Sequence, residues 1–144
     1  MEMRPSHLPD YKAPPLNEVV LGVQFNQPVG YQQIRAGEVW SLYKSNYPVV
    51  EEQPPLAPSF EMFGGRPTNV LQFQFATGAT HDRFWFLSES RDELIQFQAD
   101  RLLHNWRKVG DGTNPYPRFE RMIDKFRAEL RTLETYLATL APQK

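Results

Sequence analysis

The sequence contains no cysteine among its 144 residues. This excludes a disulfide framework, a thiolate nucleophile and a cysteine-based zinc or iron–sulfur site. Long apolar runs are also missing, because no stretch approaches the roughly 18 to 20 apolar residues that a membrane span needs. Residues 1–15 lack the apolar segment of a secretory signal. We therefore expect a soluble, cytoplasmic protein that makes no contact with a membrane.

An excess of charge of either sign is absent as well. Sixteen Lys and Arg residues balance seventeen Asp and Glu residues. The chain therefore has no global field for a phosphate backbone or an anionic surface, and any nucleic-acid contact would need a local patch. Its length fits one domain with one core, and its aromatic content of 13% is high enough to dominate that core or an interface.

Residue patterns that carry catalysis or bind metal ions are not found. The three histidines, His7, His81 and His104, are far apart in the sequence, which disfavours a histidine-based metal site. His81 precedes Asp82, but no serine or cysteine stands nearby as a nucleophile, so turn chemistry explains this pair better. We therefore predict no catalytic residues, no metal site and no cofactor.

Carboxylates and glycines give no stronger signal. The pair Glu51 and Glu52 follows a proline and precedes two more, where solvent should keep both ionised, and Glu89, Asp92 and Glu93 flank a predicted hairpin. Gly64 and Gly65 occur in "FGGRP", which lacks the lysine and serine of a phosphate-binding loop. A non-enzymatic protein is the preferred interpretation, and an enzyme with an unrecognised site is the alternative.

The N-terminal half predicts an arm, a strand, a helix and a loop. Residues 1–15 are proline-rich and form an extended arm, and residues 16–144 form the single domain. In 19–25, odd-numbered apolar residues alternate with Val20, Gly22 and Gln24, as in a half-buried strand. Residues 31–47 predict a helix whose apolar face contains Ile34, Val39, Leu42 and Tyr43 and which Pro48 ends. The prolines within 49–69 predict a surface loop without a strand.

Three strands are predicted in the central part, at 69–76, 83–88 and 94–100, with short connections that make them antiparallel neighbours. In the last of these strands Ile95 and Phe97 alternate with Gln96 and Gln98, and we expect the glutamine face to meet water or a partner. The alternation changes phase at Asp100 and Arg101. Either a bulge lies there or a tight turn begins a further strand.

A long amphipathic helix is predicted over about 117–140, with Pro117 in its first turn. Its apolar stripe recurs at alternating intervals of four and three residues: Phe119, Ile123, Phe126, Leu130, Leu133, Leu137 and Leu140. At 1.5 Å per residue such a helix spans roughly 35 Å. We expect it to exceed the sheet beneath it and to leave Leu130, Leu133, Leu137 and Leu140 for self-association, which favours a homodimer.

These elements predict an α+β fold with two layers. A curved antiparallel sheet of four to five strands carries two helices on one face, in the order β-α-β-β-β(-β)-α.

Cationic and aromatic side chains are concentrated in 101–121. They suit a surface that binds a partner, and rings that stack bases beside guanidiniums that pair phosphates would suit single-stranded nucleic acid or a nucleotide. The favoured interpretation is structural, with Trp106 as an anchor and the charges as solvated strand-edge residues. The candidate partner-binding residues are Arg101, His104, Trp106, Arg107, Lys108, Tyr116 and Arg118.

Three motifs resemble a sporadically distributed bacterial family of uncharacterised proteins, and the match spans nearly the whole chain. They are Pro14, Pro15 and Glu18 before the first strand, Asp100, Arg101, Asn105 and Trp106, and the run Tyr116 to Glu120 at the helix start. The resemblance implies that this chain corresponds to the N-terminal portion of such proteins, which continue into a second β-rich half. The resemblance supplies no established enzymatic activity and no assigned catalytic residues. A sporadic distribution is typical of defence or toxin-neutralising systems.

The sequence therefore favours a non-enzymatic protein-interaction domain that binds a partner protein or a second copy of itself through its sheet face and its long helix. Binding of single-stranded nucleic acid through residues Arg101 to Arg121 is the alternative.

Overall fold

The computed structural model describes residue 9, residues 11–58 and residues 81–142. The described elements are β1 (Glu18–Gln24), a 3₁₀ turn η1 (Gln33–Arg35), α1 (Ala36–Tyr43), β2 (Val49–Gln53), β3 (Arg83–Leu87), β4 (Glu93–Gln98), β5 (Arg101–Arg107) and α2 (Phe119–Leu140). The five strands form one antiparallel sheet in the order β1-β5-β4-β3-β2. The predicted α+β class, with two helices on an antiparallel sheet, is confirmed.

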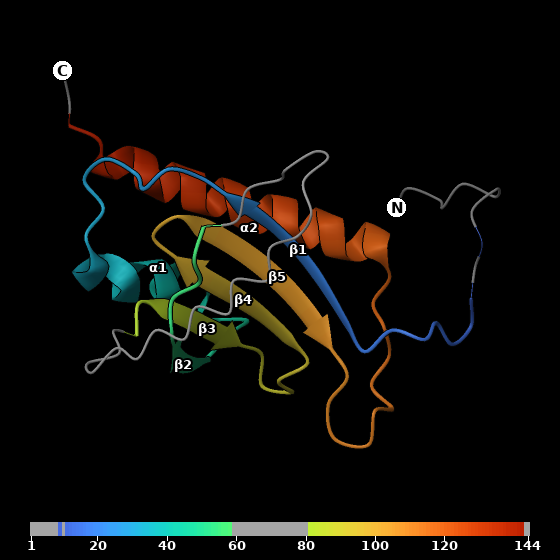
Figure 1. Cartoon of the computed structure of the whole chain (residues 1–144). Coiled ribbons are helices and arrows are strands. Elements are labelled where there is room, and N and C mark those ends of the chain that lie inside the picture. The colour runs from blue at the N-terminus through green and yellow to red at the C-terminus, as the bar shows by residue number, and fades with distance from the viewer. Residues whose placement is uncertain (1–8, 10, 59–80, 143–144) are drawn as a thin grey trace, which may run out of the picture.

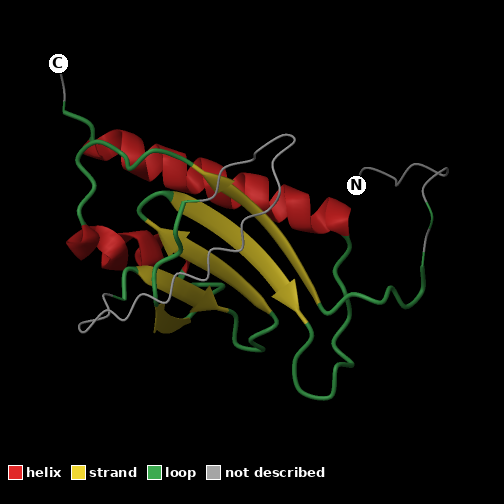
Figure 2. Cartoon of the chain, viewed as in Figure 1, coloured by secondary structure: helices red, strands yellow, loops and turns green. Residues whose placement is uncertain are grey.

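Both helices lie on the same side of the sheet (Figure 1, Figure 2). Alternate strand residues face them and form the core, which α1 completes with Val39 and Tyr43 and α2 completes with Phe126 and Leu133. Phe86, Ile95, Phe97 and Leu102 supply the strand side of that core. Because neighbouring strands are antiparallel, paired residues share a face, so one row of apolar side chains runs across the sheet under α2.

The alternation predicted for the first strand is confirmed, and the choice left open at Asp100 and Arg101 is decided. In β1, Val19, Leu21 and Val23 are partly buried while the residues between them are exposed. At Ala99 and Asp100 the chain makes a tight turn, and Gln98 pairs with Arg101 across it. The phase change read from the sequence is therefore the turn between β4 and β5 and not a bulge.

The loop predicted for 49–69 is wrong at its start, because Val49–Gln53 is strand β2. Pro48 and Pro54 flank this strand without interrupting it, and an edge strand needs a ladder on only one side. The strand predicted at 69–76 lies outside the described residues, as does "FGGRP" at 63–67 and most of the arm at 1–15.

The helix predicted over 31–47 is also too long. Its regular part is only Ala36–Tyr43, and Ile34 is exposed instead of packed beside the core. Tyr31 and Tyr47 flank the helix, and they are buried where Ile34 was expected to be. α2 begins at Phe119, so Pro117 lies before the helix and not in its first turn. Arg118 precedes the helix with φ +76° and ψ 150°.

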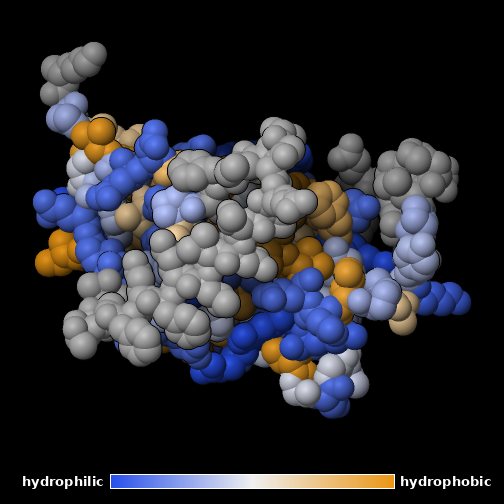
Figure 3. All heavy atoms as spheres, in the orientation of Figure 1, coloured by the Kyte–Doolittle hydropathy of each residue, from blue (hydrophilic) through white to orange (hydrophobic). Residues whose placement is uncertain are grey.

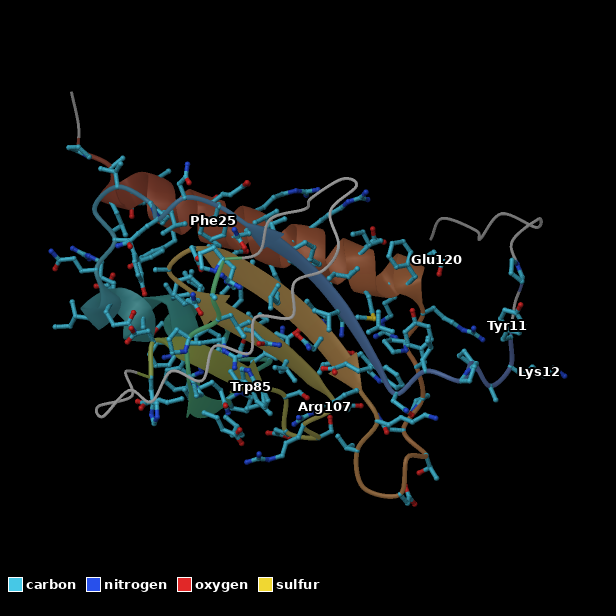
Figure 4. The ribbon with its side chains drawn as sticks, viewed as in Figure 1. Tyr11, Lys12, Phe25, Trp85, Arg107 and Glu120 are labelled. Carbon is cyan, nitrogen blue, oxygen red and sulfur yellow. The ribbon has the colours of Figure 1, made fainter. Side chains whose placement is uncertain are left out.

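The expectation for the glutamine face is wrong, because Gln96 and Gln98 are both buried. Gln98 exchanges hydrogen bonds with the backbone of Leu56, and Gln96 accepts from Arg83 and donates to Asn105. Nearby, Arg107 lies over the Trp85 ring, 5.5 Å from its centroid (Figure 4). Hydrophilic residues gather over the β3–β4 connection on the face seen in Figure 3.

Candidate functional site

The predicted partner-binding residues do not form one surface. Arg101, His104 and Trp106 are buried, whereas Arg107, Tyr116 and Arg118 are partly exposed and Lys108 is exposed. The prediction therefore fails for the three buried residues. β5 lies inside the sheet between β1 and β4, so neighbouring strands cover both of its edges. Among the described residues, Arg107, Lys108, Tyr116 and Arg118 keep exposed surface, so nucleic-acid binding through this region stays a prediction that rests on them.

Arg101 and Trp106 have structural roles. Arg101 donates from Nη2 to the carbonyl oxygens of Leu56 and Ala57, at 3.2 and 3.3 Å, and from Nε to Asp100 at 2.9 Å. It therefore fixes the chain that leaves β2 against the β4–β5 turn. Trp106 packs against Tyr116 with ring centroids 5.1 Å apart, which anchors the segment between β5 and α2.

His104 lies on the helix side of β5 and is fully buried between two carboxylates. Its Nδ1 donates to Glu129 Oε2 of α2 at 2.7 Å. Its Nε2 lies 3.5 Å from Glu93 Oε2 of β4 and makes no hydrogen bond. We call His104, Glu93, Glu129, Lys125 and Tyr47 the ionic centre.

Lys125 and Tyr47 complete this centre from two further elements. Lys125 of α2 contacts Glu93 Oε2 at 2.5 Å. The hydroxyl of Tyr47, beyond the end of α1, donates to Glu129 Oε1 at 2.7 Å. Each oxygen of Glu129 therefore has a partner, and the centre joins β4, β5 and α2 to the end of α1.

The two carboxylates set the charge of the histidine. Burial lowers the pKa of His104, but the hydrogen bond to Glu129 and the nearby Glu93 carboxylate outweigh it and raise this pKa to about 9. In turn His104, and then Lys125, hold the pKa of Glu93 down at about 2 against the effect of burial. Burial and the Glu129 carboxylate raise the pKa of Tyr47. At neutral pH His104 is therefore an imidazolium, and the Glu93 carboxyl beside it is ionised.

A polar pocket of ≈ 440 Å³ opens beside this centre, lined by Asn46, Tyr47, Ser88, Ser90, Asp92, Glu93, Lys125, Ala128 and Glu129. Ser88 and Ser90 donate to Asp92 and not to an imidazole. His104 is shielded behind Glu93 and Glu129, so it cannot reach a molecule in the pocket. Within the described ranges no three acidic or histidine side chains are placed to hold a metal ion. Among these residues the pocket offers hydrogen bonds and charge, without a base beside a nucleophile.

Sequence reasoning missed this centre. Glu93 was read as part of a hairpin flank and His104 as a surface residue, while Lys125 and Glu129 were not considered. The turn at 99–100 alone places residues 93, 95 and 97 on the same sheet face as 102, 104 and 106. Lys125 and Glu129 stand four residues apart, and therefore share one helix face. The register of a single hairpin, combined with that spacing, would have brought the four charged groups together.

The self-association residues of α2 are only partly available. Leu133 is 1% exposed and belongs to the core, so it offers almost no surface to another chain. Leu130, Leu137 and Leu140 are partly buried and pack against that core. The last turn of the helix meets the turn at Gly30, where an added Cβ would come within 2.3 Å of the Leu140 carbonyl oxygen. The end of α2 is therefore covered by the chain before α1 more fully than expected.

An apolar groove of ≈ 400 Å³ remains between α2 and the end of β1, lined by Val23, Gln24, Phe25, Asn26, Pro28, Leu130, Leu133, Glu134 and Leu137. Phe25 projects at this end of β1 beside the helix (Figure 4). We call these residues the α2–β1 groove. Four residues were predicted for self-association. Two of them, Leu130 and Leu137, line this groove and are not fully buried.

No protein-family model matches the chain, and comparisons with curated proteins and with solved structures find no match. The resemblance to the bacterial family therefore stays a prediction. No helix within the described part of the chain combines the length and the apolar character needed to cross a bilayer.

Proposed function

We propose that this chain is a non-enzymatic protein-interaction domain that binds a protein segment in the α2–β1 groove. The observation that carries the proposal is the groove itself, in which Val23 and Phe25 face Leu130 and Leu137 across an open cavity. Large aliphatic and aromatic side chains around a groove at a helix and a strand edge are typical of peptide and protein recognition.

The hydrogen bonds and ion pairs of the polar pocket support a binding role over a catalytic one. Both oxygens of Glu129 have partners, Glu93 contacts Lys125, and the serine hydroxyls donate to Asp92. The bonds of Glu129 and Glu93 hold the helix on the sheet, and those of the serines hold the β3–β4 turn, so the positions of these groups follow from packing. The groove differs in kind, because its apolar side chains have no packing partner on their open side among the described residues.

A matched pair of helix variants tests the proposal. Leu137→Lys places a charge in the groove, whereas Thr135→Lys places the same charge on an exposed helix position outside it. The tagged full chain is incubated with a lysate of its host that also contains its own untagged copy, and retained proteins are quantified by mass spectrometry. We expect Leu137→Lys to reduce retention of a specific protein by about tenfold or more, and Thr135→Lys to leave it unchanged.

Thermal melts followed by circular dichroism show whether both variants stay folded. Retention of the same proteins in the same amounts by the wild type and by folded Leu137→Lys would refute the proposal.

A further inference from the structure

The two edges of the sheet are protected differently. β2 carries Glu51, Glu52 and Gln53 in succession and is bounded by two prolines, features that discourage the addition of another strand. β1 contains no proline and no bulge, and its only charged residue is Glu18 at its first position. Val20, near the middle of β1, is 48% exposed. Of the two edges, β1 is therefore the one suited to pairing with another strand.

The register of β1 shows which backbone groups face outward. Phe25 N–H donates to the Asp100 carbonyl at 2.7 Å, and Lys108 N–H donates to the Asn17 carbonyl at 2.8 Å. Hydrogen-bonded pairs alternate along an antiparallel ladder, so the odd-numbered residues between them direct their backbone groups to β5. The backbone groups of Val20 and Gly22 therefore point away from β5, and among the described residues no strand pairs with that side.

The α2–β1 groove lies on the helix side of this same edge. A strand added beside β1 would direct every second side chain toward α2, over the groove. Two independent features, an outward-facing row of backbone groups and an apolar groove below it, thus fit one occupant. That occupant is an extended strand with apolar residues at alternate positions. β1 itself has this pattern, with Val19, Leu21 and Val23 on its helix side.

We propose that the partner is a second copy of this chain, whose β1 pairs antiparallel with β1 across a two-fold axis at Leu21. This inference rests on the protein-interaction function proposed above and names the partner. The pairing joins two five-stranded sheets into one continuous sheet of ten strands.

Three antiparallel registers would join outward-facing residues near the middle of the strand, and their side-chain pairs distinguish them. Centring on Leu21 overlaps all seven residues of both strands, and centring on Val20 or Gly22 overlaps fewer. It sets Glu18 opposite Gln24 of the second copy, so the two glutamates do not meet. It also sets Val20 opposite Gly22 of the second copy, where Leu103 offers an apolar surface next to the glycine.

On the helix side this register is wholly apolar. Leu21 meets its own equivalent at the axis, and Val19 meets Val23 of the second copy. Cross-strand pairs of this kind each contribute roughly 0.2–1 kcal/mol. Val19 of each chain thereby covers the strand wall of the other chain's groove.

Because the chain has no native cysteine, single cysteines report the register. Leu21→Cys places two thiols opposite each other at the axis, whereas Val19→Cys places them four residues apart along the paired strands, on the order of 13 Å. Under mild oxidation we expect Leu21→Cys to form a disulfide-linked dimer and Val19→Cys to stay monomeric on a non-reducing gel.

Light scattering and sedimentation equilibrium then measure the association itself. Val20→Lys should weaken dimerisation at least about tenfold, while Val50→Lys, at a similarly exposed valine of the other edge strand, should leave it unchanged. A wild-type monomer at every concentration, equal effects of the two lysines, or equal cross-linking by the two cysteines would each overturn the β1 pairing. A monomer that still retains another protein in a Leu137-dependent manner would refute this pairing and leave the protein-interaction function standing.

Discussion

At neutral pH the His104 ring is protonated at both nitrogens and carries a positive charge, although no part of it is exposed. The reason is that Glu129 and Glu93 lie beside its two nitrogens. A buried charge is tolerated only when it is paired, and removing one partner leaves the others without compensation. His104 is therefore tied to the folding of the chain through its carboxylate neighbours, and any change to it acts on both of them.

Replacing His104 by leucine should destabilise the protein by about 3–5 kcal/mol, because Glu129 then loses its cation and Glu93 keeps only Lys125. The measurement is the free energy of unfolding in urea. Adding Glu129→Gln to His104→Leu should recover part of the loss, since it removes one of the stranded charges. The control is His81→Leu, at a half-exposed histidine, which should change stability by no more than about 0.5 kcal/mol. Equal losses of unfolding free energy in His104→Leu and His81→Leu would contradict this account.

The charged residues of 101–108 show why single-residue interpretation had limits. Each was judged by its type, and cationic residues in a net-neutral chain are usually solvated. Arg101 and His104 are exceptions because β5 is an internal strand, a fact that depends on the pairing of β1 with residues about 80 positions later. The structural interpretation of Trp106 as an anchor was right, because an aromatic at the end of an apolar strand buries its ring in nearly any arrangement.

Among the elements, those with a strong periodic pattern could be predicted well. β1, β4, β5 and α2 have apolar residues at a spacing of two or of three and four, and the period follows directly from backbone geometry. β2 could not be found in this way, because a short edge strand beside several prolines has no pattern of its own and forms through pairing with β3. The sequence also could not show that the end of α2 is partly covered, since that cover depends on where the Gly30 turn lies in the fold.

The start of α2 contains a conformation that favours glycine. Arg118 has φ +76° with ψ 150°, a region in which a residue with a Cβ costs roughly 1–3 kcal/mol. Its guanidinium also donates from Nη2 to the Tyr11 carbonyl at 2.8 Å. Arg118→Ala removes that hydrogen bond and keeps the strain, whereas Arg118→Gly removes both.

The glycine variant should therefore be more stable than the alanine variant by roughly 1–2 kcal/mol, measured as the difference in their free energies of unfolding. The same pair of substitutions at Thr135, within α2, should give the opposite order, since glycine inside a helix is about 1 kcal/mol less favourable than alanine. If alanine were the more stable residue at both positions, the strain at Arg118 would be disproved.

On the scale of the whole molecule, the ionic centre is a bridge between layers. Glu93 and His104 belong to the sheet, Lys125 and Glu129 belong to α2, and Tyr47 follows α1. The apolar core below them is contributed by the same elements. Attachment of the helix layer to the sheet therefore depends on the protonation states of a few groups, and the stability of the whole domain should follow them.

The sign of that dependence follows from the two shifted groups. The pKa of His104 is raised from 6.5 to about 9, so its contribution to stability is complete below pH 6.5 and is lost as the pH rises toward 9. The pKa of Glu93 is lowered from 4.5 to about 2, so its contribution is complete above pH 4.5 and is lost as the pH falls toward 2. The free energy of unfolding should therefore be highest between about pH 4.5 and 6.5.

Urea unfolding at a series of pH values from 3 to 9 should show this maximum, with a fall on the order of 1–3 kcal/mol between pH 6.5 and 9. Burial raises the pKa values of Tyr43 and Tyr47 above the ordinary value near 10, so these phenols act only at higher pH. The alkaline fall should be absent in His104→Leu, because that variant has no imidazolium to deprotonate between pH 6.5 and 9, and its acid fall should be shallower because Glu93 has lost one of the partners that lower its pKa. A His104→Leu profile that falls as steeply as the wild type above pH 6.5 would mean that the imidazolium does not hold the helix layer on the sheet.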